Sequence, residues 1–216
     1  MSESEQIPRP FEVLRRFARR PSSSAERCEM CSQDLAISHQ HLLEPIHRKL
    51  ICACDACAML FGGETKYKRV PRRIRFLANF QMTDTQWDGL LMPINMAFFF
   101  KSTPQGRVVA LYPSPAGATE SLLSFDTWDE IVSDNPVLRE MESDVEALLV
   151  NRIGHARGFS NPEYYTVPID ECFKLVGLIR SRWQGLSGGA EVWKEIGHFF
   201  TELKAKSPQG AENSHA

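Results

Sequence analysis

The sequence predicts an α+β protein: a small treble-clef or zinc-ribbon-like module joined to a mixed sheet with C-terminal helices. Two C-x-x-C pairs, at 28–31 and 54–57, indicate the module. Alternating and apolar runs between 65 and 167 predict the sheet, and two amphipathic patterns after Ile169 predict the helices. We expect an N-terminal arm over 1–26, a zinc-binding module over 27–62, an α+β domain over 63–206 and a disordered tail over 207–216.

Composition excludes several classes of protein. Of the 216 residues, 43% are hydrophobic and 24% are charged, which are values of a globular chain and not of a disordered or collagen-like one. The net charge of −2 argues against a surface built entirely for nucleic acid. Apolar runs fall short of the roughly 18 residues that a membrane span requires, so we expect no membrane span.

The amino-terminal arm predicts a solvated amphipathic helix over Pro10–Arg20. Its double arginines lack the apolar stretch that follows in an export signal, since Pro21–Glu26 is polar and turn-forming. Five of the six cysteines lie between positions 28 and 57, a clustering that suits metal binding better than a disulfide framework. These observations together predict a cytoplasmic protein.

The segment between the two cysteine pairs predicts a hairpin. His41–Ile46 and Lys49–Ala53 have strand patterns and are joined at His47-Arg48, and Cys54–Phe61 then predicts one or two helical turns. A metal-binding turn, a hairpin and a helix with two ligands in its first turn form the order of a treble-clef zinc site. A zinc ribbon is the near alternative.

Cys28, Cys31, Cys54 and Cys57 are the predicted ligands, because four thiolates form the tetrahedral shell that zinc prefers. Iron is the alternative metal, as in a rubredoxin-like electron carrier. Such a centre usually has Gly after each pair, whereas Ser32 and Ala58 stand here. Cys52 is an alternative ligand that could replace Cys54.

Other side chains near the cysteines have predicted roles as well. His39, His41 and His47 are ligands in principle, but with four well-spaced cysteines available each is interpreted as a surface or hairpin residue. Four thiolates and a divalent ion leave a net charge of −4 + 2 = −2. We therefore expect a cation to lie over the sulfurs, and the candidates close in sequence are Arg27, Arg48 and Lys49.

In the first half of the larger domain, the sequence pattern predicts strands and one short helix. Thr65–Phe80 predicts one or two strands interrupted at Pro71. Thr83, with Gln86 three residues later, predicts a capping box at the start of a short helix. Met92–Lys101 and Arg107–Tyr112 predict a hairpin, and the proline-rich segment 113–117 predicts a loop.

The second half predicts the remaining helices. Asp126–Ser133 has a helical pattern, 145–153 fits a strand or a helix end, and 164–167 fits a strand. A helix is predicted from Ile169 to Trp183 with Asp170 as its N-cap and Cys172 in its core, and another from about Ala190 to Lys204.

Motifs of known enzyme classes are lacking, and this favours a non-enzymatic protein without deciding the question. The acidic group at 140, 142, 144 and 146 is interpreted as a solvated face. A basic stretch is the strongest argument for a nucleic-acid or partner surface. It contains Lys66, Lys68, Arg69, Arg72, Arg73 and Arg75.

Strings of residues over most of the chain, about 27–203, carry a resemblance to a known family. They are Cys28-x-x-Cys31, the stretch from His41-Leu42-Leu43 to Leu60-Phe61, Ala97-Phe98-Phe99-Phe100, Val108–Ser121, Glu146–Arg152 and Val167–Gly185. They resemble an uncharacterised bacterial family, a domain of unknown function that is typically encoded beside uptake NiFe-hydrogenase gene clusters. The basic stretch near Arg72 departs from that pattern.

Three functions follow as hypotheses. The resemblance implies, by association, a zinc-binding accessory protein that assists the assembly, maturation or operation of a hydrogenase by contacting a hydrogenase subunit or maturation protein. The basic stretch favours a nucleic-acid-binding or regulatory zinc-ribbon protein. A rubredoxin-like iron electron carrier is the third hypothesis.

Overall fold

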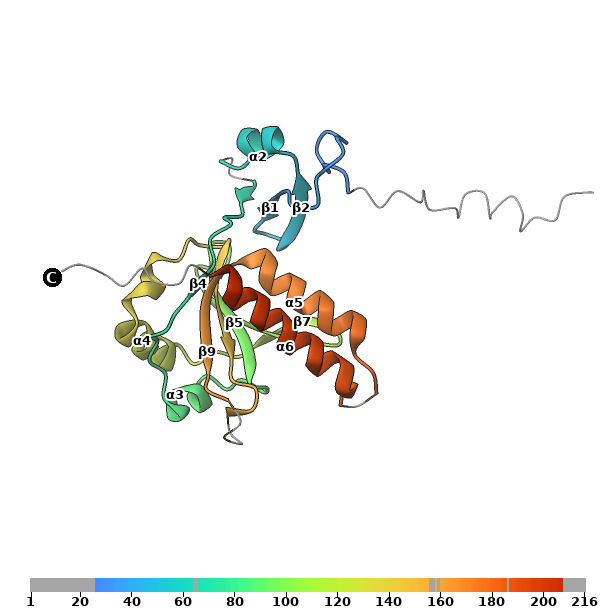
Figure 1. Cartoon of the computed structure of the whole chain (residues 1–216). Coiled ribbons are helices and arrows are strands. Elements are labelled where there is room, and N and C mark those ends of the chain that lie inside the picture. Colours follow the sequence, from blue (N-terminus) through green and yellow to red (C-terminus); the bar gives the residue numbers. More distant parts are fainter. Residues whose placement is uncertain (1–25, 64–65, 156–157, 159, 186, 208–216) are drawn as a thin grey trace, which may run out of the picture.

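The computed structural model of the chain describes residues 26–63, 66–155, 158, 160–185 and 187–207. It confirms the predicted α+β class, with two antiparallel sheets and two long helices at the carboxyl end (Figure 1). The predicted helix over Pro10–Arg20 and the predicted tail beyond Ser207 lie outside the described residues. No helix of the described part is both long and apolar enough to cross a membrane.

The small sheet is built on the predicted hairpin. Its strands β1 (Gln40–Glu44) and β2 (Lys49–Ala53) are antiparallel and are followed by helix α2 (Asp55–Phe61), as predicted. Strand β3 (Lys68–Arg69) pairs with the other side of β1, so the order is β2-β1-β3. The small sheet therefore extends past Gly62, where the sequence predicted the module to end.

Among the described residues, the large sheet has six antiparallel strands in the order β4-β9-β8-β5-β6-β7. They are β4 (Arg75–Phe76), β5 (Met96–Ser102), β6 (Arg107–Ser114), β7 (Gly117–Ser121), β8 (Glu146–Asn151) and β9 (Glu163–Pro168). The predicted hairpin is the β5–β6 pair. The prediction of a loop over 113–117 is wrong, because β6 runs to Ser114 and a tight turn leads into β7, the edge strand. Proline is tolerated in β6 near this edge of the sheet.

In the described part of the chain, four helices and a short 3-10 helix accompany the large sheet. They are α3 (Asp84–Gly89), α4 (Phe125–Asp134), the 3-10 helix Pro136–Glu140, α5 (Ile169–Arg182) and α6 (Gly189–Lys206). The predicted capping box at Thr83 and Gln86 is confirmed. The prediction that Asp170 caps α5 is wrong: Pro168 is the N-cap, and Asp170 lies within the first turn.

Helices cover both faces of the large sheet. Alternation along β5 places Phe98 and Phe100 in the core beneath α5 and α6, whereas Phe99 stacks on Trp128 of α4 on the other face. In Figure 1, α5 and α6 lie on one side of the sheet and α3 and α4 on the other. This double burial explains why the central strands are almost continuously apolar.

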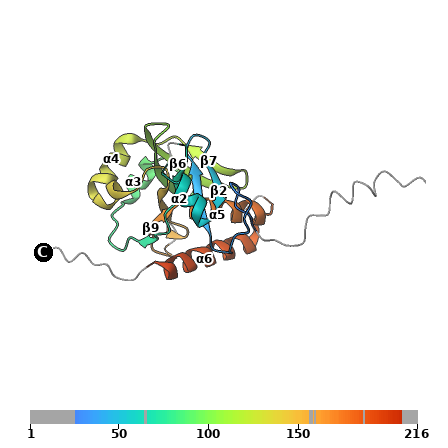
Figure 2. The same cartoon turned by 90° about the horizontal axis from the view of Figure 1, so that it is seen from above.

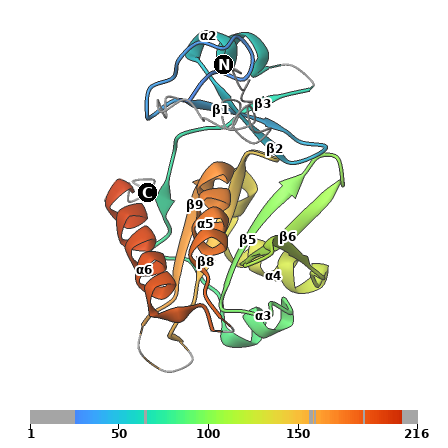
Figure 3. The same cartoon turned by 90° about the vertical axis from the view of Figure 1, so that its right-hand side faces the viewer.

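The small sheet and α2 lie over one end of the large sheet (Figures 2 and 3). Leu43 of β1 and Val70, just after β3, belong to the same buried cluster as the core beneath α5. Two ion pairs also join the two parts, Lys68–Asp144 at 2.7 Å and Arg48–Glu120 at 3.1 Å, and a hydrogen bond of 2.8 Å joins His41 Nδ1 to the Asp170 carboxylate. The small module is thus fixed to the body by apolar packing and by charge.

Candidate metal centre

The first cysteine pair lies in a tight turn. The Cys28 N–H donates to the Gln33 carbonyl and the Ser32 N–H donates to the Cys28 carbonyl, both at 2.8 Å. Ser32 has φ 65°, the left-handed conformation that such a turn requires. The Glu29 N–H donates to the Cys52 carbonyl at 2.9 Å, which holds the turn against the end of β2.

The second pair lies at the amino terminus of α2. Cys54 is the N-cap of this helix, and its Sγ accepts a hydrogen bond from the Cys57 N–H at 3.5 Å. Sulfur takes the place here of the oxygen that usually caps a helix. An N–H donor at a helix start stabilises a thiolate, so this placement suits a metal-binding cysteine.

The fold brings the four sulfurs together. The Sγ atoms of Cys28, Cys31, Cys54 and Cys57 all lie within 4.8 Å of one another. The Cys31 and Cys54 sulfurs are 3.7 Å apart. A tetrahedral shell with Zn–S bonds of about 2.3 Å has sulfur–sulfur edges of about 3.8 Å. The cysteine positions therefore fit a four-coordinate metal ion.

The cluster is closed on one side and open on the other. Cys28, Cys54 and Cys57 are buried with Leu42 and other apolar residues of the hairpin, whereas Cys31 is exposed. The apolar side excludes water from the sulfurs, and the exposed side gives an ion a way in.

Cys28 and Cys57 of the cluster differ in acidity. Burial acts to raise the pKa of Cys28, but backbone N–H groups of Cys54, Cys31 and Met30 outweigh it and lower that pKa to about 6. Burial, together with the neighbouring sulfurs of Cys54, Cys31 and Cys28, raises the pKa of Cys57 to about 12. Four ionised sulfurs at this spacing repel one another unless a metal ion lies between them.

The cations expected over the sulfurs form ion pairs with carboxylates. Arg27 pairs with Asp34 at 3.0 Å and Lys49 with Glu29 at 3.4 Å. Arg48 pairs with Glu120 and lies over the Phe100 ring. Backbone N–H groups, and not these side chains, are the donors directed at the sulfurs.

The structure places Cys52 apart from the four clustered cysteines. Its Sγ lies with ring nitrogens of His39 and His41 in a second group whose atoms are within 4.8 Å of one another. His47 is an exposed turn residue that pairs with Glu44. Cys172 is fully buried on α5, as predicted.

The basic stretch is half neutralised by the acidic group. Lys68 pairs with Asp144, Arg73 with Glu146 at 3.0 Å and Arg75 with Glu140 at 3.1 Å. The interpretation of the acidic group as a solvated face is wrong for Asp144 and Glu146, which are only 2% and 1% exposed. The cations that remain exposed without such a pair in the described part of the chain are Lys66, Arg69 and Arg72.

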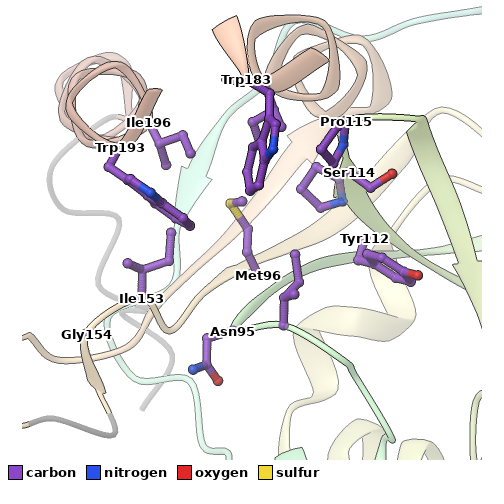
Figure 4. A pocket seen from close by; sticks show the side chains of 13 residues that line it. Asn95, Met96, Tyr112, Ser114, Pro115, Ile153, Gly154, Trp183, Trp193 and Ile196 are labelled. Atoms are coloured by element: carbon purple, nitrogen blue, oxygen red, sulfur yellow. The ribbon is translucent and has the colours of Figure 1, made fainter. Parts of the chain in front are cut away.

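A pocket of about 800 Å³ that no cysteine lines lies between the start of β5, the end of β6, α5 and α6 (Figure 4). Trp183 and Trp193 line it, and their indole N–H groups donate to backbone carbonyls of Gly185 and Ser187. The rings thus offer mainly carbon to the cavity, which suits an apolar group. The lining residues come from separate segments of the chain, so no local pattern in the sequence indicates this pocket.

Comparison with known proteins identifies a family whose model matches this chain. The model of a family of unknown function (DUF5947) matches residues 27–207, which include both cysteine pairs, the sheets and the final helices. No curated protein and no solved structure matches the chain.

Proposed function

This chain belongs to the DUF5947 family of unknown function, and we propose that it is a cytoplasmic zinc-binding accessory protein that acts through protein–protein contacts. Its zinc module is of the treble-clef type, and the ion is structural. The observation that carries the proposal is the convergence of four cysteine sulfurs from a turn and a helix start. Cysteines that bind a metal must stay reduced, and the cytoplasm is a reducing compartment. The four-cysteine cluster therefore supports the cytoplasmic assignment.

Apolar side chains exposed on the module support a docking role. Met59 and Leu60 of α2 are 72% and 68% exposed, and Ile37, before β1, and Ile46, in the turn between β1 and β2, are more exposed still. Helix α2 lies on the side of the small sheet away from the body (Figure 3). A rigid metal-bound module that presents apolar residues outward is suited to contact another protein.

The proposed partner is a subunit or a maturation protein of a NiFe hydrogenase, and the support for it is the family resemblance described above. The double variant Met59→Glu/Leu60→Glu places two charges on the outer side of α2. We expect it to fold with full metal content and to recover at least tenfold less hydrogenase protein than wild type in a pull-down from hydrogenase-expressing cells.

The matched control is Leu122→Glu, which adds a charge at another exposed apolar residue, on the body. It should recover as much partner as wild type. Recovery of no hydrogenase subunit or maturation protein by the wild-type chain would contradict the proposed partner. Equal recovery by the double variant would contradict the proposed docking face.

The nucleic-acid hypothesis has a separate test. Because three of the six cations in the basic stretch pair with carboxylates of the body, we expect weak DNA binding at most. Duplex and single-stranded DNA should not retain the chain at about 50 mM salt, in an assay where a basic DNA-binding protein is retained. Tight binding that weakens steeply with salt would support the regulatory alternative instead.

A further inference from the structure

We propose that the chain has a second metal site, formed by His39, His41 and Cys52. It lies on the face of the β1–β2 hairpin opposite the four-cysteine cluster, next to the first turn of α5. The site takes a thiophilic divalent ion such as zinc, held by two imidazoles and one thiolate. It goes beyond the proposed function, which needs only the first ion.

Strand alternation assembles the three side chains. His41 of β1 and Cys52 of β2 are paired directly across the hairpin, so they project from the same face of the sheet. His39 precedes His41 by two residues and shares that face. One ring nitrogen of each histidine and the Cys52 sulfur lie within 4.8 Å of one another. Leu42 and Ile51, on the other face, pack in the cluster that contains the four cysteines.

Hydrogen bonds fix which nitrogen of each ring is available. The Nδ1 of His41 lies 2.8 Å from a carboxylate oxygen of Asp170, and the Nδ1 of His39 lies 2.9 Å from the Ala36 carbonyl. Both partners can only accept, so each Nδ1 carries the proton. Each Nε2 then keeps its lone pair for a metal. Asp170 orients His41 in the way that carboxylates behind metal-binding histidines do.

His39 supplies the strongest indication of a ligand. Its side chain is only 6% exposed, and its Nε2 is buried without a hydrogen-bond partner among the described residues. A buried polar atom without a partner is unfavourable, because it has lost its hydrogen bonds to water. A metal ion bound to Nε2 would satisfy this atom. His41 and Cys52 are partly exposed, which leaves an entry path for the ion.

The chemistry of this site differs from that of the first. Three protein ligands leave the fourth tetrahedral position open to water or another ligand, as in zinc sites that are not purely structural. Two neutral imidazoles, one thiolate and a divalent ion sum to 2 − 1 = +1, which the Asp170 carboxylate offsets. Because Asp170 belongs to α5, an ion here would also tie the small module to the body.

Zinc stoichiometry of the full chain tests the proposal. Metal-free protein is dialysed against zinc, and bound zinc is measured by elemental analysis. We expect two ions per wild-type chain and one ion per chain for His39→Gln, His41→Gln and Cys52→Ser. His47→Gln, at the exposed turn of the same hairpin, is the matched control and should still bind two. Circular dichroism establishes that each variant is folded.

Asp170→Asn adds a graded readout. Asn keeps the side-chain volume but weakens the orientation of His41, so the second zinc should bind about 10- to 100-fold more weakly while the first is unaffected. One zinc per wild-type chain, or two zinc ions retained by folded His39→Gln and His41→Gln, would overturn the second site. A His41→Gln chain that binds no zinc at all would instead count against the four-cysteine site.

Discussion

Replacing Cys57 with Ser is expected to abolish metal binding at the four-cysteine site and to unfold the small module. The module buries little apolar surface of its own beyond the cluster around Leu42 and Ile51, so metal binding supplies much of its folding free energy. For structural zinc sites this contribution is on the order of 10 kcal/mol. Elemental analysis would show the loss of both zinc ions, because the second site lies on the β1–β2 hairpin of the same module. The amides of β1, β2 and α2 would lose protection from hydrogen exchange.

The matched control is Cys172→Ala, which removes a buried thiol from the body and not from the module. It should keep the full metal content and lower the melting temperature only through a small cavity beneath α5. If Cys57→Ser kept wild-type metal content and unchanged melting, the ligand assignment would be contradicted.

Replacing Asp144 with Ala is expected to lower the free energy of unfolding by about 3–5 kcal/mol, because it removes two hydrogen bonds to a buried carboxylate together with the ion pair to Lys68. The Asp144 carboxylate accepts hydrogen bonds from the Thr103 N–H at 2.8 Å and the Thr103 hydroxyl at 2.6 Å, and it pairs with Lys68. Its φ of 72° adds a further cost, because Ala rarely adopts that conformation. Urea denaturation of the full chain measures the change.

Asp144→Asn is the conservative comparison. Asn tolerates positive φ and still accepts a bond from Thr103, but it cannot neutralise Lys68, so its expected cost is about 1–2 kcal/mol. Because Lys68 belongs to β3, both variants should also loosen the small sheet from the body. If the unfolding free energies of both variants lay within about 0.5 kcal/mol of wild type, the Asp144–Lys68 pair would contribute nothing to stability.

Local patterns were sufficient to predict much of this fold. The hairpin before Cys54, the short helix after it and the Thr83 capping box depend on residues close together in sequence. The position of the cysteine cluster follows from the same spacing, since each C-x-x-C pair forms one tight turn. The apolar run over 145–153 was ambiguous between helix and strand, because a strand buried on both faces has no period to detect.

Contacts between residues far apart in the chain could not be predicted from the sequence. The two short strands around Pro71 join different sheets, which no local signal indicates. The carboxylates of Asp144 and Glu146 looked solvated because their partners, Lys68 and Arg73, lie more than seventy residues earlier. The contact between His41 and Asp170 joins residues that are 129 positions apart, so no local pattern indicates it either.

X-ray absorption at the zinc edge tests the central claim most directly. The measurement uses the His41→Gln chain purified without added metal, because that variant retains only the four-cysteine site. We predict one zinc per chain, no iron, and a shell of four sulfurs at about 2.3 Å. Metal-free protein whose Cys28, Cys31, Cys54 and Cys57 all react as free thiols, or a zinc shell of nitrogen and oxygen, would contradict the account.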